Sequence, residues 1–427
     1  MNILGKVYLE KNVYTAALER LEKIFSQDFA VYFSFSGGKD SSVMLQLANI
    51  VAKEKNKKFD VLFIDLEGNY QYTIDHVNDL KNLSQINKFY WVCLPLVLRN
   101  AVSQLSTHWV CWDKRQKEFW IRDMPENCIN EDNYLSKYGW DFFINDMQFE
   151  TFIVAFAKWY QKKHSKPVMC GVGIRTNESF NRFRTIVSLR KEKWQDYNWT
   201  TLVQNDLHLP IYNFYPIYDW QTRDIWIAVS QLDLKYNQLY ELFYKSGLSI
   251  HEARICQPYG DDQRKGLSQF KAIEPETWSK LLIRVGGVNF GNIYAKSLAL
   301  GYMKLEKPKH LTWQEYTIFL LESIGNKNYD LMIHYARKIE RFIEWYEVKK
   351  GVPMQDFAPK YLESKKKVAS WRRCAKMILK NDYYGRGLSF SQTKRDDAEL
   401  KAMLEKDETE NKIIYFDERL KENGRRD

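Results

Sequence analysis

Hydrophobic positions in the N-terminal part of the chain follow two patterns, one with a helical period and one made of short continuous runs. Residues 10–26 carry apolar side chains at helical spacing and predict an amphipathic helix. Apolar runs at 31–35, 59–65 and 89–94 predict buried strands. Because a helix fits between the first two runs, they form a βαβ unit, which predicts a parallel sheet with ligands at the carboxyl ends of its strands.

Helical periodicity dominates the later part of the chain. Apolar side chains recur at helical spacing at 149–162, 311–324 and 330–348, and Thr312 can cap the second of these helices. The segment from about 105 to 165 is otherwise aromatic, polar and irregular. We interpret this segment as an insertion over the active site or as a surface for a partner.

The length of 427 residues fits two or three domains on a prior of about 150 residues each. We expect an α/β fold, with a parallel doubly wound, Rossmann-like sheet that carries the insertion and a mostly helical C-terminal domain. The first domain is placed at 1–245 and the second, which is basic, at 246–427.

A glycine turn separates the first strand from the helix that follows it. In the letters SFSGGKDSS, Gly37 and Gly38 stand directly before a helix that begins at Lys39. Backbone N–H groups at such a turn point into one small space, with the positive end of the helix dipole behind them, and this geometry binds phosphate. Serine hydroxyls can add donors, Lys39 adds a point charge, and Asp40 can cap amides or hold a metal. The expected phosphate-binding residues are Ser34, Ser36, Gly37, Gly38, Lys39, Asp40, Ser41 and Ser42.

This loop resembles the pyrophosphate-binding loop, or PP-loop, of the N-type ATP pyrophosphatases and their sulfonucleotide-reductase relatives, which share the adenine nucleotide alpha hydrolase-like fold. Its spacing differs from that of the ATPase P-loop, G-x-x-x-x-G-K-[ST]. The alternative is a glycine turn with a surface lysine. The resemblance implies that the ligand is an adenine nucleotide, either ATP or PAPS (3′-phosphoadenosine-5′-phosphosulfate).

The second predicted strand ends at Asp65-Leu66-Glu67-Gly68, beside the expected phosphate loop. In position, although not in letters, this element resembles the one that packs near the adenosine in PP-loop enzymes. Asp65 and Glu67 are therefore candidate contacts for ribose or Mg²⁺, and Asp40 is a further candidate ligand of Mg²⁺. The alternative is that these acidic residues are carboxylates at a helix entry.

A second motif, MCGVGIRTNESFNRFR, follows a short predicted strand and carries Arg175 at the strand's carboxyl end. Arg182 lies four residues after Glu178, so the two can pair on one helix face and leave Arg175 to bind an anion in a bidentate way. The letters resemble the G-x-R-x-x-E-S-x-x-R element of PAPS reductases. The resemblance implies that phosphate or sulfate is bound by Gly173, Arg175, Arg182 and Arg184, and that the catalytic residues are Lys39, Asp40 and Arg175.

The stretch YNFYPIYDWQTRDIW at 212–226 resembles the P-I-x-x-W-t-x-x-D-V-W signature that closes the nucleotide domain of the same family. We expect a mainly structural role for it, in which Gln221 or Thr222 caps a helix. Asp219 is a candidate ligand contact.

Charge and cysteine usage narrow the function classes. The net charge of +10 and the pI near 9.0 favour polyanionic partners, although an ordinary basic surface explains them equally well. The six cysteines form no C-x-x-C pair, which predicts reduced thiols in the cytoplasm and no iron–sulfur cluster. Cys256 has basic neighbours and is the candidate reactive thiol, with an inert structural thiol as the alternative. No run reaches the roughly 18 apolar residues that a membrane helix needs, so no membrane partner is expected.

Nearly the whole chain resembles a subfamily of PAPS reductase-like proteins that includes the immunoglobulin-binding regulator A of enteric bacteria, encoded beside a ParB-like partner. The resemblance implies a ParB-like protein partner and a role in gene regulation. Separately, the cationic run from Lys365 to Lys380 contains Trp371 and is a candidate contact for nucleic acid, with a solvated helix face as the alternative.

Three functions are consistent with these features. The first is cleavage of ATP between its α and β phosphates, with adenylyl transfer and release of pyrophosphate. The second is binding of PAPS with reduction or sulfur transfer, which the C-terminal tail disfavours because it lacks the nucleophilic cysteine of the reductases. The third is a nucleotide-dependent regulator that acts with a ParB-like partner or DNA.

Overall fold

The computed structural model describes residues 9–101, 103, 106–188, 191–203, 207–255, 259–260, 267–285, 307–308, 310–325 and 328–406. The chain divides into two compact units. Unit 1 comprises residues 1–97, 111–257 and 269–278, and unit 2 comprises residues 98–110, 258–268 and 279–427. In the described ranges, we find no helix whose length and apolar character would let it cross a membrane.

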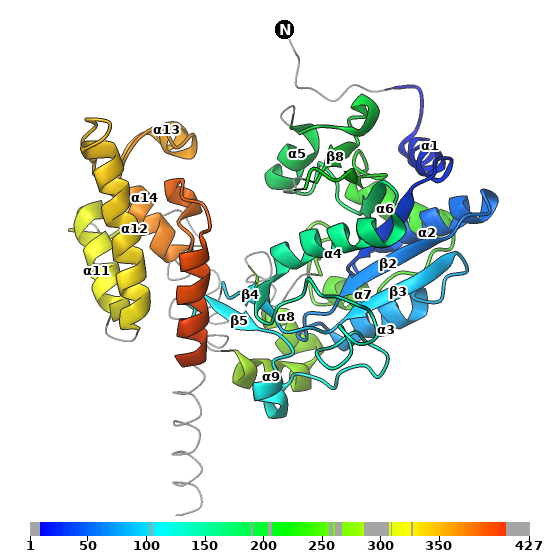
Figure 1. Cartoon of the computed structure of the whole chain (residues 1–427), viewed down its shortest axis with the longest axis horizontal. Helices are drawn as coiled ribbons and strands as arrows, with labels where there is room; N and C mark the ends of the chain where they lie inside the picture. Colours follow the sequence, from blue (N-terminus) through cyan, green and yellow to red (C-terminus); the bar gives the residue numbers. More distant parts are fainter. Residues whose placement is uncertain are drawn as a thin grey trace, which may run out of the picture. The chain divides into compact units, whose positions relative to one another are not determined.

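Unit 1 is built on a sheet with the strand order β3-β2-β1-β7-β9-β8. Figure 1 labels β2, β3 and β8 of this sheet. All neighbouring strands pair in parallel except β8, which runs antiparallel to β9 at one edge. The three predicted strands are confirmed, and the third begins earlier than expected, at Ile86. The strands are β1 (Ala30–Phe35), β2 (Phe59–Ile64), β3 (Ile86–Val92), β7 (Val168–Val172), β8 (Thr200–Leu202) and β9 (Ile211–Phe214).

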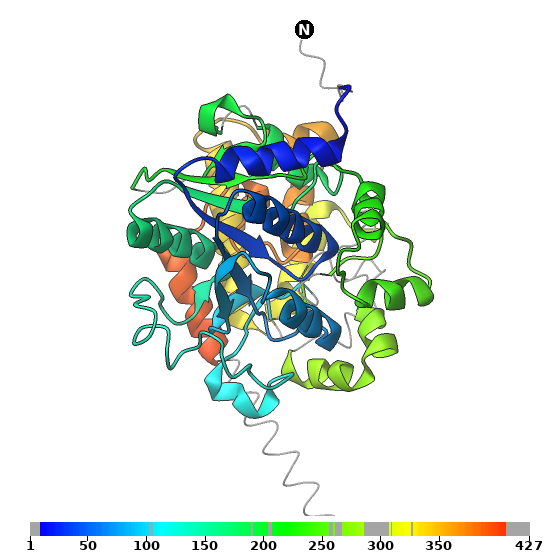
Figure 2. The same ribbon diagram turned by 90° about the vertical axis from the view of Figure 1, so that its right-hand side faces the viewer.

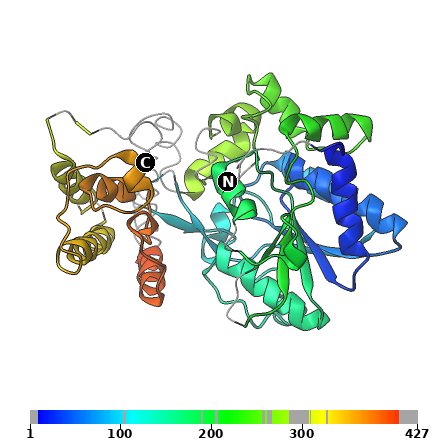
Figure 3. The ribbon, with the colours of Figure 1, turned by 90° about the horizontal axis from the view of Figure 1, so that it is seen from above.

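Helices cover both faces of this sheet, as expected for a doubly wound fold. Successive residues of a strand point to opposite faces, and in β1 the ring of Tyr32 packs on Phe156 of α4 whereas the ring of Phe33 packs on Phe25 of α1. Helices α1 and α2 lie side by side on one face, and α4 lies on the other (Figures 2 and 3). The helices are α1 (Val13–Phe25), α2 (Lys39–Glu54), α3 (Gln71–Leu80), α4 (Phe149–His164), α5 (Phe180–Val187), α6 (Thr222–Gln231), α7 (Leu239–Lys245), α8 (Leu267–Ile273) and α9 (Pro275–Arg284), with short 3₁₀ turns η1 (Lys114–Phe119) and η2 (Trp194–Asp196).

The order of the strands places a ligand site next to β1. The chain first adds β2 and β3 on one side of β1 and then adds β7 and β9 on the other side. A crevice opens at the carboxyl ends of parallel strands where the direction of winding reverses in this way. The loops after β1 and β7, which carry the two sequence motifs, therefore meet at this point.

The last strand of the predicted insertion pairs with a short strand that precedes the insertion. Strand β4 (Leu96–Arg99) pairs in parallel with β6 (Met147–Gln148), which leads directly into α4. The predicted helix at 149–162 is confirmed by α4. Most of the segment between β4 and β6 is irregular, as its mixed aromatic and polar composition predicts.

Unit 2 contains the mostly helical C-terminal region that the sequence predicts. Helices α11 and α12 contact each other, and α14 packs on α11. The predicted cap is confirmed, because the Thr312 hydroxyl accepts a hydrogen bond from the Glu315 backbone N–H at 3.1 Å while the Glu315 carboxylate accepts one from the Thr312 N–H at 2.6 Å. The elements of this unit are β5 (His108–Val110), α11 (Trp313–Gly325), α12 (Tyr329–Glu347), α13 (Lys360–Ser364), α14 (Trp371–Leu379) and η5 (Arg386–Leu388).

Candidate functional site

The loop between β1 and α2 has a conformation that only glycine permits at its centre. Gly37 has a φ of +71°, and a Cβ atom there would stand 2.7 Å from the Thr73 side chain. The Gly37 carbonyl accepts a hydrogen bond from the side-chain amide of Asn237 at 3.2 Å, and Asn237 also donates to the Thr73 hydroxyl at 3.1 Å. The turn is therefore held from two directions, by α3 and by the segment before α7.

Backbone N–H groups of this loop gather at the N-terminus of α2. Within the described part of the chain, no protein atom accepts a hydrogen bond from the N–H groups of Gly37, Gly38, Asp40 or Ser41. Gly38 is the N-cap residue in an extended conformation, and as a glycine it offers no side chain to cap the helix. Unpaired amides and the positive end of a helix dipole attract an anion, so the loop has the geometry of a phosphate cradle.

Serine side chains tighten the loop from inside. The Ser41 hydroxyl lies 3.0 Å from the Ser36 hydroxyl and donates to the Gly38 carbonyl at 3.0 Å. The Ser42 hydroxyl lies 2.9 Å from the same carbonyl and 2.7 Å from Nε2 of His76. Ser34 lies on β1, half-buried. Three of the predicted serines thus shape the cradle, and the sequence did not identify their partner His76.

Buried charges lie directly beside the cradle. Nε of Arg175 donates to the Asp40 carboxylate at 2.5 Å, and Nζ of Lys39 lies 3.6 Å from the other oxygen of the same carboxylate. Arg175 is 2% exposed, and its Nη1 atom has no hydrogen-bond partner among the described residues. A buried guanidinium N–H without a partner is costly, and an anionic ligand would satisfy it. The predicted trio Lys39, Asp40 and Arg175 is therefore brought together.

Gly173 explains how Arg175 reaches Asp40. A Cβ atom at Gly173 would stand 2.8 Å from the Cα atom and 3.0 Å from the backbone nitrogen of Ser41. Only glycine allows the loop after β7 to approach the first turn of α2 this closely. The two sequence motifs consequently share one wall of the site.

Glu178 organises the second group of arginines. It pairs with Arg182 at 2.5 Å, as predicted, but it does so from the loop before α5 rather than from a helix face, because the helix begins only at Phe180. Its backbone carbonyl accepts a hydrogen bond from Arg254 at 2.8 Å. Burial raises the pKa of Glu178, although the neighbouring Arg182 opposes this shift. Arg184 is exposed and lies over the ring of Phe180, and among the described residues no hydrogen bond or ion pair joins it to the cradle. Arg254 was not predicted from the sequence, because only the fold brings it to Glu178, which lies 76 residues away along the chain.

The acidic residues after β2 have a structural role that the sequence did not predict. Both Asp65 and Glu67 are completely buried. The Asp65 carboxylate accepts hydrogen bonds from Arg122 and from the indole of Trp91, the latter at 2.9 Å. The Glu67 carboxylate accepts from the backbone N–H of Trp112 at 2.6 Å.

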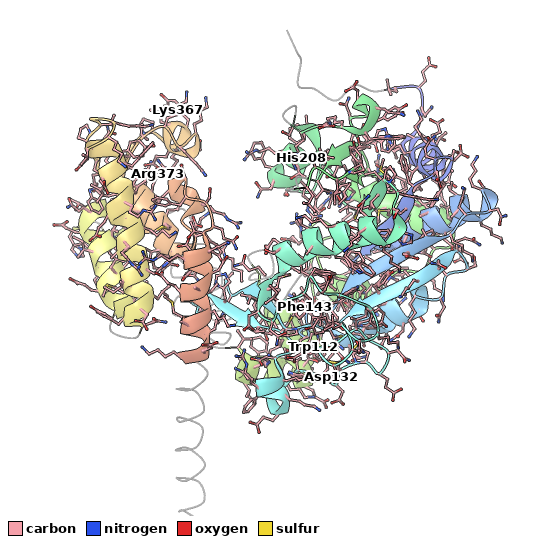
Figure 4. The ribbon with its side chains drawn as sticks, viewed as in Figure 1. Trp112, Asp132, Phe143, His208, Lys367 and Arg373 are labelled. Atoms are coloured by element: carbon pink, nitrogen blue, oxygen red, sulfur yellow. The ribbon has the colours of Figure 1, made fainter. Side chains whose placement is uncertain are left out.

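These contacts fasten the insertion to the end of β2 (Figure 4 labels Trp112). The indole of Trp112 also donates to the backbone carbonyl of Asp65 at 2.7 Å, and Glu67 accepts a second bond from the Ile121 N–H at 3.2 Å. Protein donors thus occupy both carboxylates, and the Asp40 carboxylate is paired with Arg175 and Lys39. The expected contacts of these residues with ribose or Mg²⁺ stay a prediction.

Residues in and after α7 contact the start of α2 at the site. The Tyr240 hydroxyl accepts a hydrogen bond from the Lys39 backbone N–H at 3.0 Å, and Nζ of Lys39 donates to the Ala253 carbonyl at 3.4 Å. No local signal in the sequence marks Tyr240 as part of the site, since it lies 201 residues from Lys39. Cys256, the candidate thiol, lies outside the described residues.

The third motif is structural, as expected. Gln221 and Asp224 form a capping box at the start of α6, and the indole of Trp220 donates to the Val13 carbonyl at 3.0 Å. Asp219 is bound by Arg20 through two hydrogen bonds of 2.8 and 2.6 Å, so this carboxylate anchors α1 rather than a ligand.

Two family models match the chain. Residues 30–247 match the phosphoadenosine phosphosulfate reductase domain, and residues 247–363 match a domain of unknown function, DUF3440. The first match begins at β1 and includes both motifs of the site.

Similar structures include the PAPS reductase of Candida auris in a phosphate complex, with a TM-score of 0.28 and 14% identity over 56% of this chain and 94% of that one. They also include the FMN adenylyltransferase of Candida glabrata in complex with FAD and inorganic pyrophosphate. That match has a TM-score of 0.30 and 15% identity, and it covers 55% of this chain and 63% of the other.

Relatives in sequence align over half of the chain or more. The uncharacterized protein YbdN of Escherichia coli is 39% identical over 394 residues, which cover 91% of this chain and 93% of YbdN. The uncharacterized protein MJ0973 of Methanocaldococcus jannaschii is 28% identical over 55% of this chain, which spans only 44% of that protein. These matches do not support the resemblance to the immunoglobulin-binding regulator, which stays a prediction. The chain belongs to the phosphoadenosine phosphosulfate reductase domain family.

Proposed function

We propose that this protein binds ATP at the loop between β1 and α2 and cleaves it between the α and β phosphates, so that adenylate passes to an acceptor and pyrophosphate is released. One observation carries the proposal. Among the described residues, amides at the start of α2 and the Nη1 atom of buried Arg175 lack hydrogen-bond partners, and Nε of Arg175 binds Asp40 in the first turn of the same helix. Membership of the phosphoadenosine phosphosulfate reductase domain family supports an adenine nucleotide as the anion that binds at this loop.

The chain's own residues would act by positioning and electrostatics. The amides of Gly37, Gly38, Asp40 and Ser41 would hold the pyrophosphate part of ATP, and Arg175 would stabilise charge that develops on the α-phosphate. An acceptor oxygen would attack the α-phosphorus, and the bond from that phosphorus to the bridging oxygen would break, with the electron pair leaving on pyrophosphate. Asp40 would hold the guanidinium of Arg175 in place through their 2.5 Å hydrogen bond.

PAPS is the alternative ligand for the same cradle. Arg182 and Arg254, which both contact Glu178, would then bind a sulfate or a 3′-phosphate. Cys256 or an external thiol would be the reductant. A third alternative is a regulator that binds nucleotide without turnover and acts with a ParB-like partner. That partner rests on the sequence resemblance alone.

Calorimetric titration of ATP, with magnesium present, and of PAPS separates these functions. Replacement of Lys39 by alanine removes a cation that is only 6% exposed and lies at the helix start. We expect at least a tenfold loss of nucleotide affinity, because a charge-assisted contact is worth about 1.5–3 kcal/mol. The control is Arg184→Ala, which removes the same charge from an exposed side chain outside the cradle. Unchanged affinity in the Lys39 variant would refute the cradle.

A pyrophosphate-release assay then tests the reaction. Tight ATP binding with released pyrophosphate supports adenylyl transfer. Preference for PAPS without pyrophosphate would favour the sulfonucleotide alternative, and full activity of Cys256→Ser would remove that residue from it. Binding without turnover of either nucleotide would leave the regulatory function.

A further inference from the structure

A surface at the C-terminal end of α12 combines lysines with exposed aromatic rings. We call residues 345–367 the lysine–aromatic surface; they run from the end of α12 through α13, within unit 2. The Tyr346 hydroxyl donates to the Lys366 carbonyl at 3.1 Å, which ties the two ends of this segment together. Figure 1 shows α13 beside this end of α12, and Figure 4 labels Lys367 at the same end.

Three of the four aromatic rings of this surface are exposed to solvent, and Arg372 lies over one of them, that of Phe357. Exposure is 49% for Trp345, 61% for Phe357 and 63% for Tyr361. Nζ of Lys349 and of Lys350 lie 5.7 and 5.5 Å from the centre of the Trp345 ring. Large aromatic side chains normally bury their area, so three exposed rings within one short segment need a partner to explain them.

The acidic side chains of the segment are used internally. Asp356 accepts hydrogen bonds from the backbone N–H groups that begin α11, at 2.6 and 3.2 Å. Glu347 accepts one from the Met354 N–H at 3.1 Å, and Glu363 is paired with Arg372 at 3.0 Å. All six lysines of the surface are exposed, so the charge it presents is positive: Lys349, Lys350, Lys360, Lys365, Lys366 and Lys367.

The cationic run that the sequence emphasised divides into two classes in the structure. Arg373 is 3% exposed and donates to the backbone carbonyls of Val368 and Gly387, and Arg372 is held by Glu363. These arginines therefore stabilise the fold of unit 2. The lysines at 365–367 remain at the surface and join those at the end of α12 instead.

We propose that the lysine–aromatic surface binds single-stranded nucleic acid. Lysines neutralise a phosphate backbone, and exposed rings stack on bases that are not paired. The rings favour a single strand over a duplex, because the bases of a duplex already stack on each other. Charge complementarity favours a nucleic acid, since the acids of this segment are occupied while its lysines are exposed. This proposal is independent of the nucleotide site in unit 1.

Fluorescence anisotropy of labelled oligonucleotides tests the proposal with the full chain. Single strands of about 20 nucleotides exceed the usual site size, and a duplex of the same sequence is the comparison. We expect Trp345→Ala to weaken single-strand binding about fivefold or more, since one stacked base is worth about 1–3 kcal/mol. The matched control is Tyr329→Ala, which removes a ring that is 63% exposed at the opposite end of α12.

Salt dependence gives a second, independent measure. Replacing Lys365 and Lys367 with glutamine should reduce the slope of log affinity against log salt by about 1.4, because each phosphate contact of a single strand contributes about 0.7. The control pair Lys394→Gln and Lys401→Gln removes the same charge elsewhere on unit 2 and should leave the slope unchanged.

Three results would overturn the proposal. The first is that single strands do not bind at about 50 mM salt. The second is that duplex and single strand bind with equal affinity and Trp345→Ala does not change it. The third is that the surface variants and the control variants lose the same affinity. If only an acidic protein binds this surface, the proposal also fails. Lys39→Ala should leave nucleic acid binding unchanged, so failure here and failure of the nucleotide site can be told apart.

Discussion

Acidification should destabilise unit 1 through His76. This side chain is 4% exposed, its Nε2 lies 2.7 Å from the Ser42 hydroxyl, and burial lowers its pKa from 6.5 to about 4. The unfolded chain therefore binds a proton at a higher pH than the folded chain does. Stability from neutral His76 is fully present above pH 6.5 and is lost as the pH falls toward 4. Between pH 7 and pH 5, the loss from this one group is about 2 kcal/mol.

Urea unfolding at pH 7 and at pH 5, followed by tryptophan fluorescence, measures this loss. His76→Gln removes the titrating group, so the variant should lose about 2 kcal/mol less than the original chain over the same range. His108 is also buried, with a pKa lowered to about 3, but it titrates in both proteins and cancels from the comparison. The control is the exposed His310, whose replacement by glutamine should change nothing. If the original chain and His76→Gln lose equal stability, the assignment to His76 is wrong.

Two further substitutions test the walls of the site. Gly173→Ala would place a Cβ atom 2.8 Å from the Ser41 backbone, so we expect the first turn of α2 to shift and nucleotide affinity to fall at least tenfold in calorimetry. Retained affinity with an unchanged circular dichroism spectrum would contradict that expectation. Glu67→Gln turns a donor toward the N–H of Trp112 or of Ile121, which should cost about 1–3 kcal/mol and speed proteolysis of the insertion. Equal proteolysis rates would show that Glu67 does not hold this loop.

Local features of the sequence were sufficient to predict the main elements of unit 1. Strands β1 and β2 are mostly apolar, interrupted only by Ser34 and Asp60, and a parallel sheet buries such runs on both faces. The turn at Gly37 was recognisable because its positive φ and its close approach to Thr73 require glycine. Pairing of Glu178 with Arg182 was predicted from their spacing on a helix, and the pair forms, although Glu178 lies before the start of α5 at Phe180.

Roles of the acidic residues could not be predicted in the same way. Asp65 and Glu67 stand at a strand end, where carboxylates often contact ligands. The sequence there is equally consistent with a ligand contact and with a structural role. The fold brings donors from the insertion to them, Arg122 to Asp65 and the Trp112 amide to Glu67. A buried carboxylate requires such partners, and their positions depend on the path of the whole insertion.

By itself, therefore, the sequence determined the strands, the glycine loop and the family of this protein, because these depend on side-chain periodicity and on conformations that one residue type permits. Only the tertiary structure decided which polar groups meet. Tyr240 reaches Lys39 across 201 residues, and Arg175 reaches Asp40 across 135. The physical reason is that the charge and hydrogen bonding of a buried group depend on the partners that surround it, and chain neighbours do not supply them here.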